Sequence, residues 1–242
     1  MLNVRLFPLL VAGSSEASGE EHRGIATYRL LTGAHPADVD ITNDSNFDRH
    51  ALASILAAAA MDGGFVSERA GLSSDELATL LEQHFPSVRI KADELLLRFK
   101  HNDNDEVIMV RDLLLSQRST RGDTGRWLAQ MIARRAIEPN HLWEDLGLRD
   151  RGELCRLLDR HFASLAGRNT NNMRWKRFFY RTLCADEGLV ICTTPVCTQC
   201  KDFNLCFGDE SGESRMAERR REALLQEPVP AAGRHAAILE SR

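Results

Sequence analysis

The 242-residue sequence lacks any long uncharged apolar stretch. Its longest such run, Ala51 to Met61, is far shorter than the roughly 20 residues that a membrane-spanning helix needs. The apolar run from Leu6 to Ala12 follows a single Arg5, and it is too short and too weakly charged to act as a secretion signal. We therefore expect a cytoplasmic protein with no membrane partner.

An excess of basic charge is also missing, because 31 Lys and Arg residues stand against 35 Asp and Glu residues, for a net charge of -4. This balance excludes a global attraction to nucleic acid, so any basic surface must be local. The alternation of apolar and polar residues that is typical of β-strands is nearly absent. The composition is that of an ordinary globular protein, and we predict an all-α fold.

The two ends of the chain are poor in periodic apolar residues. Residues 13–24 are rich in Gly, Ser and Glu, and the stretch after residue 210 ends in Pro, Ala, Gly and Arg. We predict a largely flexible leader over residues 1–46, a single helical domain over 47–210 and a largely flexible tail over 211–242.

A weak internal duplication emerges when the chain is shifted against itself by 76 residues. The matched positions are Leu52, Ala53, Ala57, Ala60, Gly71 and Leu72 with Leu128, Ala129, Ala133, Ala136, Gly147 and Leu148, and, after a one-residue insertion, Glu76, Leu77, Leu80, Leu81, His84 and Phe85 with Glu153, Leu154, Leu157, Leu158, His161 and Phe162. Each copy predicts an apolar helix, a Gly-Leu turn and an amphipathic helix. We predict a compact helical bundle built from two weakly repeated helical hairpins, with a further core helix over 107–117.

Two features of this repeat invite specific expectations. Ser73 or Ser74 is expected to cap the second helix of the first copy, with Glu76 in its first turn. His84 and His161 occupy equivalent places near helix ends. One possibility is that they form a paired site, either for acid/base chemistry or for binding a ligand. We favour the other possibility, that each histidine has a structural role at the C-terminus of its helix.

Four of the six cysteines lie within one short segment. They are Cys192, Cys197, Cys200 and Cys206. Spacings of four, two and five residues allow one loop, over 184–208, to bring these thiolates to one metal centre. A structural zinc site usually joins two ligand pairs a dozen or more residues apart, and only one CxxC is present. We favour an iron-sulfur site over zinc, and either over four free cysteines.

The segment before this loop combines cations and aromatic residues. Its cations are Arg174, Lys176, Arg177 and Arg181, with no acidic residue before Asp186. Trp175, Phe178 and Phe179 share one helical face, which predicts buried aromatic rings and exposed cations. We assign the cations to cofactor binding, facing an anionic cluster, an oxoanion or an acidic partner protein. A plain solvated basic face is the alternative, and nucleic acid is not expected because the aromatics are inward.

Two cysteines stand apart from the loop. Cys155 falls on the second helix of the second copy and is expected to be a small core side chain. Cys184 is a buried structural thiol or an extra metal ligand, and we favour the former.

These motifs resemble the NifQ family. The resemblance lies in Met-Arg-Trp-Lys-Arg-Phe-Phe-Tyr (173–180), in Leu-Cys-Ala-Asp-Glu-Gly (183–188), in the cysteine spacing followed by Phe-Gly (207–208), in Asn-His-Leu-Trp-Glu-Asp-Leu-Gly-Leu (140–148) and in the Leu-Leu-x-x-His-Phe segment (157–162). It covers residues 48–210.

The resemblance implies a carrier rather than an enzyme, with no catalytic residues. Such a carrier holds a molybdenum-iron-sulfur cluster, takes up molybdenum as molybdate and donates it for the iron-molybdenum cofactor in nitrogen fixation. Its implied partners are the nitrogenase iron protein and the cofactor-assembly scaffold. His141 becomes a candidate extra ligand, although a structural role is favoured. The alternatives are an electron-transfer or redox-sensing iron-sulfur protein and a zinc-stabilised interaction module.

Overall fold

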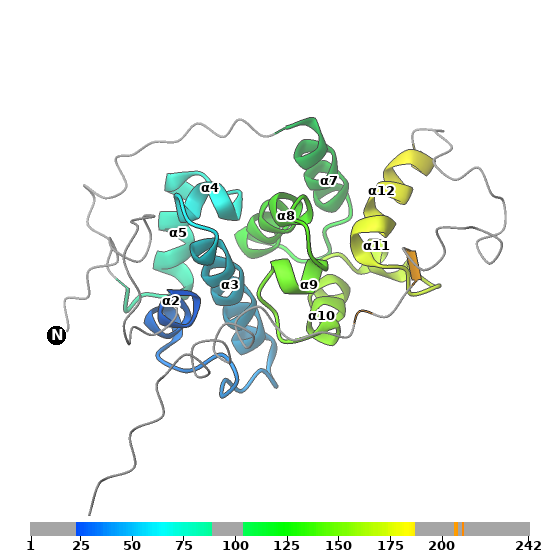
Figure 1. The fold of residues 1–242 in the computed structure, drawn as a ribbon. Coiled ribbons are helices and arrows are strands. Elements are labelled where there is room, and N and C mark those ends of the chain that lie inside the picture. Colours follow the sequence, from blue (N-terminus) through cyan, green and yellow to red (C-terminus); the bar gives the residue numbers. More distant parts are fainter. Residues whose placement is uncertain (1–22, 89–103, 187–205, 208–209, 211–242) are drawn as a thin grey trace, which may run out of the picture.

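The computed structural model describes residues 23–88, 104–186, 206–207 and 210 (Figure 1). The helices are α2 (Arg23–Thr32), α3 (Asp44–Met61), α4 (Val66–Ala70), α5 (Ser74–His84), α7 (Asp105–Ser116), α8 (Asp123–Ala136), α9 (Leu142–Asp145), α10 (Arg151–His161), α11 (Ala163–Gly167) and α12 (Trp175–Asp186). No strand occurs in the described residues, so the predicted all-α class is confirmed. None of the described helices is both long enough and apolar enough to cross a membrane.

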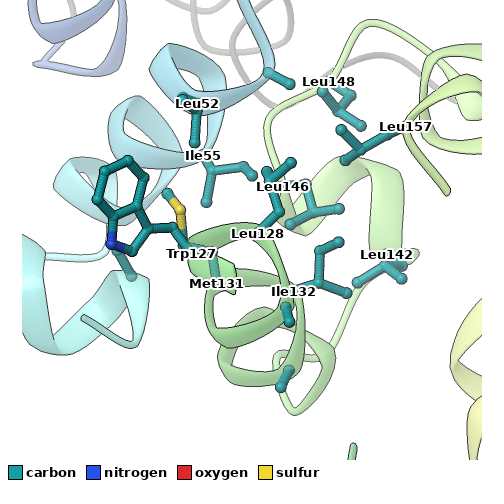
Figure 2. Close-up of a cluster of buried hydrophobic side chains, with 14 of the residues drawn as sticks. Leu52, Ile55, Trp127, Leu128, Met131, Ile132, Leu142, Leu146, Leu148 and Leu157 are labelled. Carbon is teal, nitrogen blue, oxygen red and sulfur yellow. The ribbon is translucent and has the colours of Figure 1, made fainter. Parts of the chain in front are cut away.

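Helices α3 and α8 form the centre of the fold. Along α3 small apolar residues occur on every side, and a helix that is apolar all round is buried. Figure 2 shows Leu52 and Ile55 of α3 among the same buried side chains as Trp127 and Leu128 of α8. Helix α8 also contacts α4, α5, α7 and α9, so it joins the two halves of the chain.

Helix α2 packs against α3 and corrects part of the predicted leader. Ile25, Tyr28 and Leu31 are buried, and the Tyr28 hydroxyl lies 2.6 Å from Nδ1 of His50 on α3. The folded part therefore begins before residue 47. The prediction failed because three apolar residues within a polar segment gain their burial mainly by packing against α3, which is distant from the local sequence pattern. The predicted tail over 211–242 lies outside the described residues.

The two segments matched in the sequence have the same order of elements. A long helix (α3 or α8) is followed by a short helix (α4 or α9), a glycine with positive φ and a second long helix (α5 or α10). Gly71 and Gly147 have φ angles of 75° and 68°, which favour glycine. After each glycine, the backbone N–H of Leu72 or Leu148 donates back to the preceding short helix, in the manner of a Schellman cap.

Each of these glycines lies against the first helix of the other segment. A Cβ atom added at Gly71 would lie 2.9 Å from the carbonyl oxygen of Gln130, and one at Gly147 would lie 2.6 Å from that of Ser54. Ser54 and Gln130 are themselves related by the shift of 76 residues. The two segments thus make reciprocal contacts, whereas their duplication stays a prediction.

Two expected local features are present. Ser73 caps α5 in a capping box, in which its side chain accepts from Glu76 N and the Glu76 carboxylate accepts from Ser73 N. The core helix expected over 107–117 is α7, with Val107, Val110 and Leu114 buried.

The two equivalent histidines each bond to the other segment. His84 Nε2 lies 3.1 Å from Oγ1 of Thr124, and His161 Nε2 lies 3.0 Å from Oδ1 of Asp48. His161 Nδ1 is also 2.8 Å from Oγ1 of Thr120. Because each histidine has its own partners at its own helix end, the geometry supports the structural role.

Candidate metal-binding region at helix α12

Helix α12 is fixed by its aromatic face. Trp175, Phe178 and Phe179 are all buried, as the sequence predicts, and the rings of Trp175 and Phe178 meet edge to face at 5.6 Å between centroids. The helix contacts α7, and the Tyr180 hydroxyl donates to the carboxylate of Glu106 there. The aromatic stripe therefore sets which side of α12 faces outward.

The four cations of this segment do not share one surface. Arg177 and Arg181 are exposed and Arg174 is half-buried. Lys176 points inward: its Nζ lies 2.5 Å from Oδ2 of Asp145 and also donates to a backbone carbonyl of residue 138. Burial lowers the pKa of Lys176, and the hydrogen bond to Asp145 opposes that effect.

Asp145 joins α12 to a buried charge network. Its carboxylate is fully buried and also accepts from the side-chain amide of Asn140 at 3.0 Å, while its carbonyl accepts from Arg135 Nε at 2.8 Å. Arg135 is itself fully buried and forms an ion pair with Asp62 at the end of α3. Lys176 therefore anchors α12 to α8 and α9.

Of the four loop cysteines, Cys192, Cys197 and Cys200 lie outside the described residues. Cys206 is placed at the beginning of α12, where its carbonyl oxygen accepts from the backbone N–H of Arg174 at 2.8 Å. Cys206 and Phe207 both pack against the hydrophobic core. The backbone of the last loop cysteine is thus held beside that of Arg174.

The two remaining cysteines lie in different places relative to Cys206. Cys184 is ten residues beyond Arg174 and near the far end of α12, about 15 Å along the axis at about 1.5 Å per residue. A metal–thiolate bond is only about 2.3 Å long, which favours the structural role for Cys184. Cys155 is half-buried on α10 and packs against the hydrophobic core.

Glu210 joins the region from the other side of the loop. Its side chain is only 5% exposed, its Oε1 lies 3.3 Å from Nδ1 of His141, and its carboxylate forms an ion pair with Arg151. Arg151 Nη2 also donates to Asn172 Oδ1 at 2.8 Å and to the carbonyl of Met173 at 3.0 Å. Sequence reasoning missed Arg151 and Glu210, since their partners are distant in the chain.

The charges around His141 influence one another. Burial lowers the pKa of His141; Glu144 raises it, and the neighbouring Arg174, Lys176 and Arg151 cations lower it. Arg174 and Arg151 also interact electrostatically. Arg151 and Arg174 therefore provide the positive charge of this region, His141 lies beside them, and the backbone of Arg174 is bonded to that of Cys206.

Within the described part of the chain, no group of three or more His, Cys, Asp and Glu side chains is arranged to hold a metal ion. Cys206 is the only member of the predicted thiol set in that part. In donor chemistry, a set of four thiolates fits soft metals and iron-sulfur clusters. The geometry of the full set is a prediction.

Comparison with known families and proteins identifies the chain. A family model described as NifQ matches residues 51–208, which include all four loop cysteines, α12 and the helices that anchor it. The chain belongs to the NifQ family. Its similarity to NifQ thus extends well beyond the cysteine loop into the helical body.

Individual NifQ proteins agree with this assignment. A "Protein NifQ homolog" from Sinorhizobium fredii is 41% identical over 183 residues, covering 74% of this chain and 78% of that protein. The NifQ proteins of Rhodobacter capsulatus and Azotobacter vinelandii are 36% and 38% identical, covering 61% and 58% of this chain and 80% and 77% of those proteins. No solved structure matches the chain.

Proposed function

We propose that this NifQ-family chain is an iron-sulfur and molybdenum carrier that captures molybdenum and donates it for assembly of the nitrogenase iron-molybdenum cofactor in nitrogen fixation. The observation that carries the proposal is the position of Cys206. Its backbone carbonyl accepts a hydrogen bond from the backbone N–H of Arg174, whose charge also acts on Arg151 and His141, so one residue of the family's cysteine set adjoins a region that carries two arginines. A carrier of an anionic cluster and an incoming oxoanion needs both a cysteine ligand and positive charge close to it.

In this proposal the cargo is held by Cys192, Cys197, Cys200 and Cys206. Thiolates are the preferred ligands of iron-sulfur clusters, and nearby cations and N–H donors favour the thiolate form. Four thiolates do not saturate a cluster that also binds molybdenum. A coordination position therefore stays exchangeable, as donation to a partner requires.

The cations of α12 divide into two roles in this proposal. Arg174 lies at the cluster end of the helix, and the exposed Arg177 and Arg181 provide positive charge on its outer side. Lys176 holds α12 in place through Asp145 instead of meeting the cargo. We assign no catalytic residue, because capture and donation require ligand exchange rather than turnover of a substrate.

The proposed partners are the nitrogenase iron protein and the cofactor-assembly scaffold, in the cytoplasm. The outward-facing Arg177 and Arg181 suit an acidic partner surface, since charged pairs at the rim of an interface steer association. No role in nucleic-acid binding is proposed: the aromatic rings that would stack on bases are buried in the core.

Elemental analysis tests this function. The full chain, purified without oxygen, is incubated with molybdate and assayed for iron, sulfide and molybdenum. We expect all three, and we expect each single Cys→Ser change in the loop to lower the metal content. Iron and sulfide without molybdenum would instead indicate an electron-transfer or redox-sensing protein. A colourless protein with stoichiometric zinc would indicate a zinc-stabilised interaction module.

A further inference from the structure

We propose that His141, Arg151 and Arg174 form a binding site for a tetrahedral oxoanion, and that the carboxylate of Glu210 fills this site until the oxoanion displaces it. The inference rests on the proposed function, for which it identifies where molybdate binds before it reaches the cluster.

Three separate segments supply the hydrogen-bond donors of the site, two of them arginines and one a histidine. His141 precedes α9, Arg151 is the first residue of α10, and Arg174 immediately precedes α12. The side chains of His141 and Arg151 are 29% and 19% exposed, so solvent reaches them only in part. Charge-assisted hydrogen bonds are stronger in such partly dry surroundings than in water.

Glu210 shows what kind of ligand these groups accept. One carboxylate oxygen faces the His141 imidazole, and the carboxylate is paired with the Arg151 guanidinium. A planar guanidinium binds carboxylates and tetrahedral oxoanions through the same pair of N–H groups. The buried carboxylate therefore occupies the place that two oxygens of a tetrahedral dianion would take.

Contacts other than Glu210 hold Arg151 in position. Arg151 donates to Asn172 and to the carbonyl of Met173, directly before Arg174. The other nearby carboxylate, that of Glu144, accepts from the backbone N–H of His141 at 2.8 Å and so serves the start of α9. Removing Glu210 therefore leaves the Arg151 guanidinium tied to the segment that leads into α12.

The site adjoins the cluster loop. Glu210 follows Cys206 by four residues, and the Cys206 carbonyl is bonded to the backbone N–H of Arg174. An oxoanion that displaces Glu210 would arrive beside the last cluster thiol. The exchange replaces one anion with another, so no covalent bond forms or breaks, and the displaced carboxylate moves into solvent.

Molybdate binding to cluster-free protein tests the site. The full-length chain carrying Cys192→Ser, Cys197→Ser and Cys200→Ser is titrated with molybdate by calorimetry, with tungstate and sulfate as competing tetrahedral dianions. Adding Glu210→Gln is expected to tighten molybdate binding by about tenfold, because the competing charge is gone. Adding Arg151→Gln is expected to weaken it by about tenfold or more.

Matched controls come from the exposed ion pair of Arg168 with Asp186, which involves the far end of α12. Asp186→Asn and Arg168→Gln remove the same charges there and should leave the molybdate dissociation constant unchanged. Equal affinity in the Glu210→Gln variant and its parent would overturn the inference, and this variant decides the matter even if Arg151→Gln does not fold.

This outcome is separable from that of the proposed function. Cluster-free protein that binds molybdate as expected supports the oxoanion site even if the iron-sulfur form retains no molybdenum. Conversely, the protein could contain molybdenum in its cluster while Glu210→Gln leaves its affinity for molybdate unchanged. That result would support the carrier function and refute this oxoanion site.

Discussion

Gly147 lies so close to Ser54 that a Cβ atom at Gly147 would be 2.6 Å from the Ser54 carbonyl oxygen. The turn after α9 thereby packs directly on the backbone of α3, and the turn after α4 packs on α8 in the equivalent way. Such close backbone approach explains why each turn needs a residue without a side chain. The two halves of the fold depend on each other through these contacts.

Gly147→Ala should destabilise the protein strongly. Alanine would add the cost of a positive φ, about 1–2 kcal/mol, and that of an overpacked contact with α3, about 1–3 kcal/mol. Urea unfolding measures the loss. The control is Gly33→Ala, where φ is 78° but a Cβ atom would meet nothing within 4 Å. A similar loss in both variants would show that the contact with Ser54 contributes nothing.

Lys176→Met should cost about 3–5 kcal/mol of unfolding free energy, because it leaves the fully buried Asp145 carboxylate without its cation. Arg177→Gln, at the next and exposed position, should change stability by less than about 0.5 kcal/mol. Denaturant titration of both variants gives the comparison. Combining Lys176→Met with Asp145→Asn should recover part of the loss, and no recovery would contradict the pairing.

Acid should remove part of the stability that Asp48 provides. Burial raises the pKa of Asp48, but hydrogen bonds from His161 and Arg160 outweigh it and bring the pKa below its ordinary 3.8. The folded state therefore binds fewer protons than the unfolded state near this pKa. The stabilisation is fully present above pH 3.8 and is lost as the pH falls through the lower folded value.

Asp48→Asn measures this contribution. It should cost about 1.5–3 kcal/mol at neutral pH and flatten the decline of stability with acid, as followed by urea unfolding down to about pH 3. Asp112→Asn, which alters an exposed pair with Arg111, is the matched control and should leave the profile unchanged. An equally steep acid decline in Asp48→Asn would rule out the role of Asp48.

Replacing Cys184 should leave the metal content nearly intact, whereas replacing Cys206 should lower it. The difference follows from their places near opposite ends of α12, since only Cys206 is beside Arg174. Iron and molybdenum are measured in anaerobically purified Cys184→Ser and Cys206→Ser proteins. Equal losses in both would mean that Cys184 is also a ligand.

Local sequence patterns, namely helical periodicity and capping residues, predicted the parts of the fold that depend on neighbours in the chain. The aromatic stripe of Trp175, Phe178 and Phe179 is buried as expected, and Ser73 caps α5 as expected. Both features are decided within one or two turns of helix, so neighbours in the sequence carry the signal. The all-α class follows from the same kind of evidence.

Interactions between residues far apart in the chain could not be predicted from local sequence patterns. Lys176 falls on the polar side of α12 by spacing, yet its long side chain reaches Asp145, 31 residues earlier. Glu210 has no local pattern that ties it to His141 or Arg151. Helix α2 was missed for the same reason, because its burial comes from α3.

The hydrogen bond from Arg174 N–H to Cys206 C=O joins backbone atoms and is therefore indifferent to the side chain at position 206. This bond brings together the backbone before and after the cysteine loop, and so it contributes to loop closure independently of any metal. Cys206→Ser removes the proposed ligand but leaves this backbone hydrogen bond in place. The metal content of this variant therefore tests the proposed coordination without removing the backbone contact.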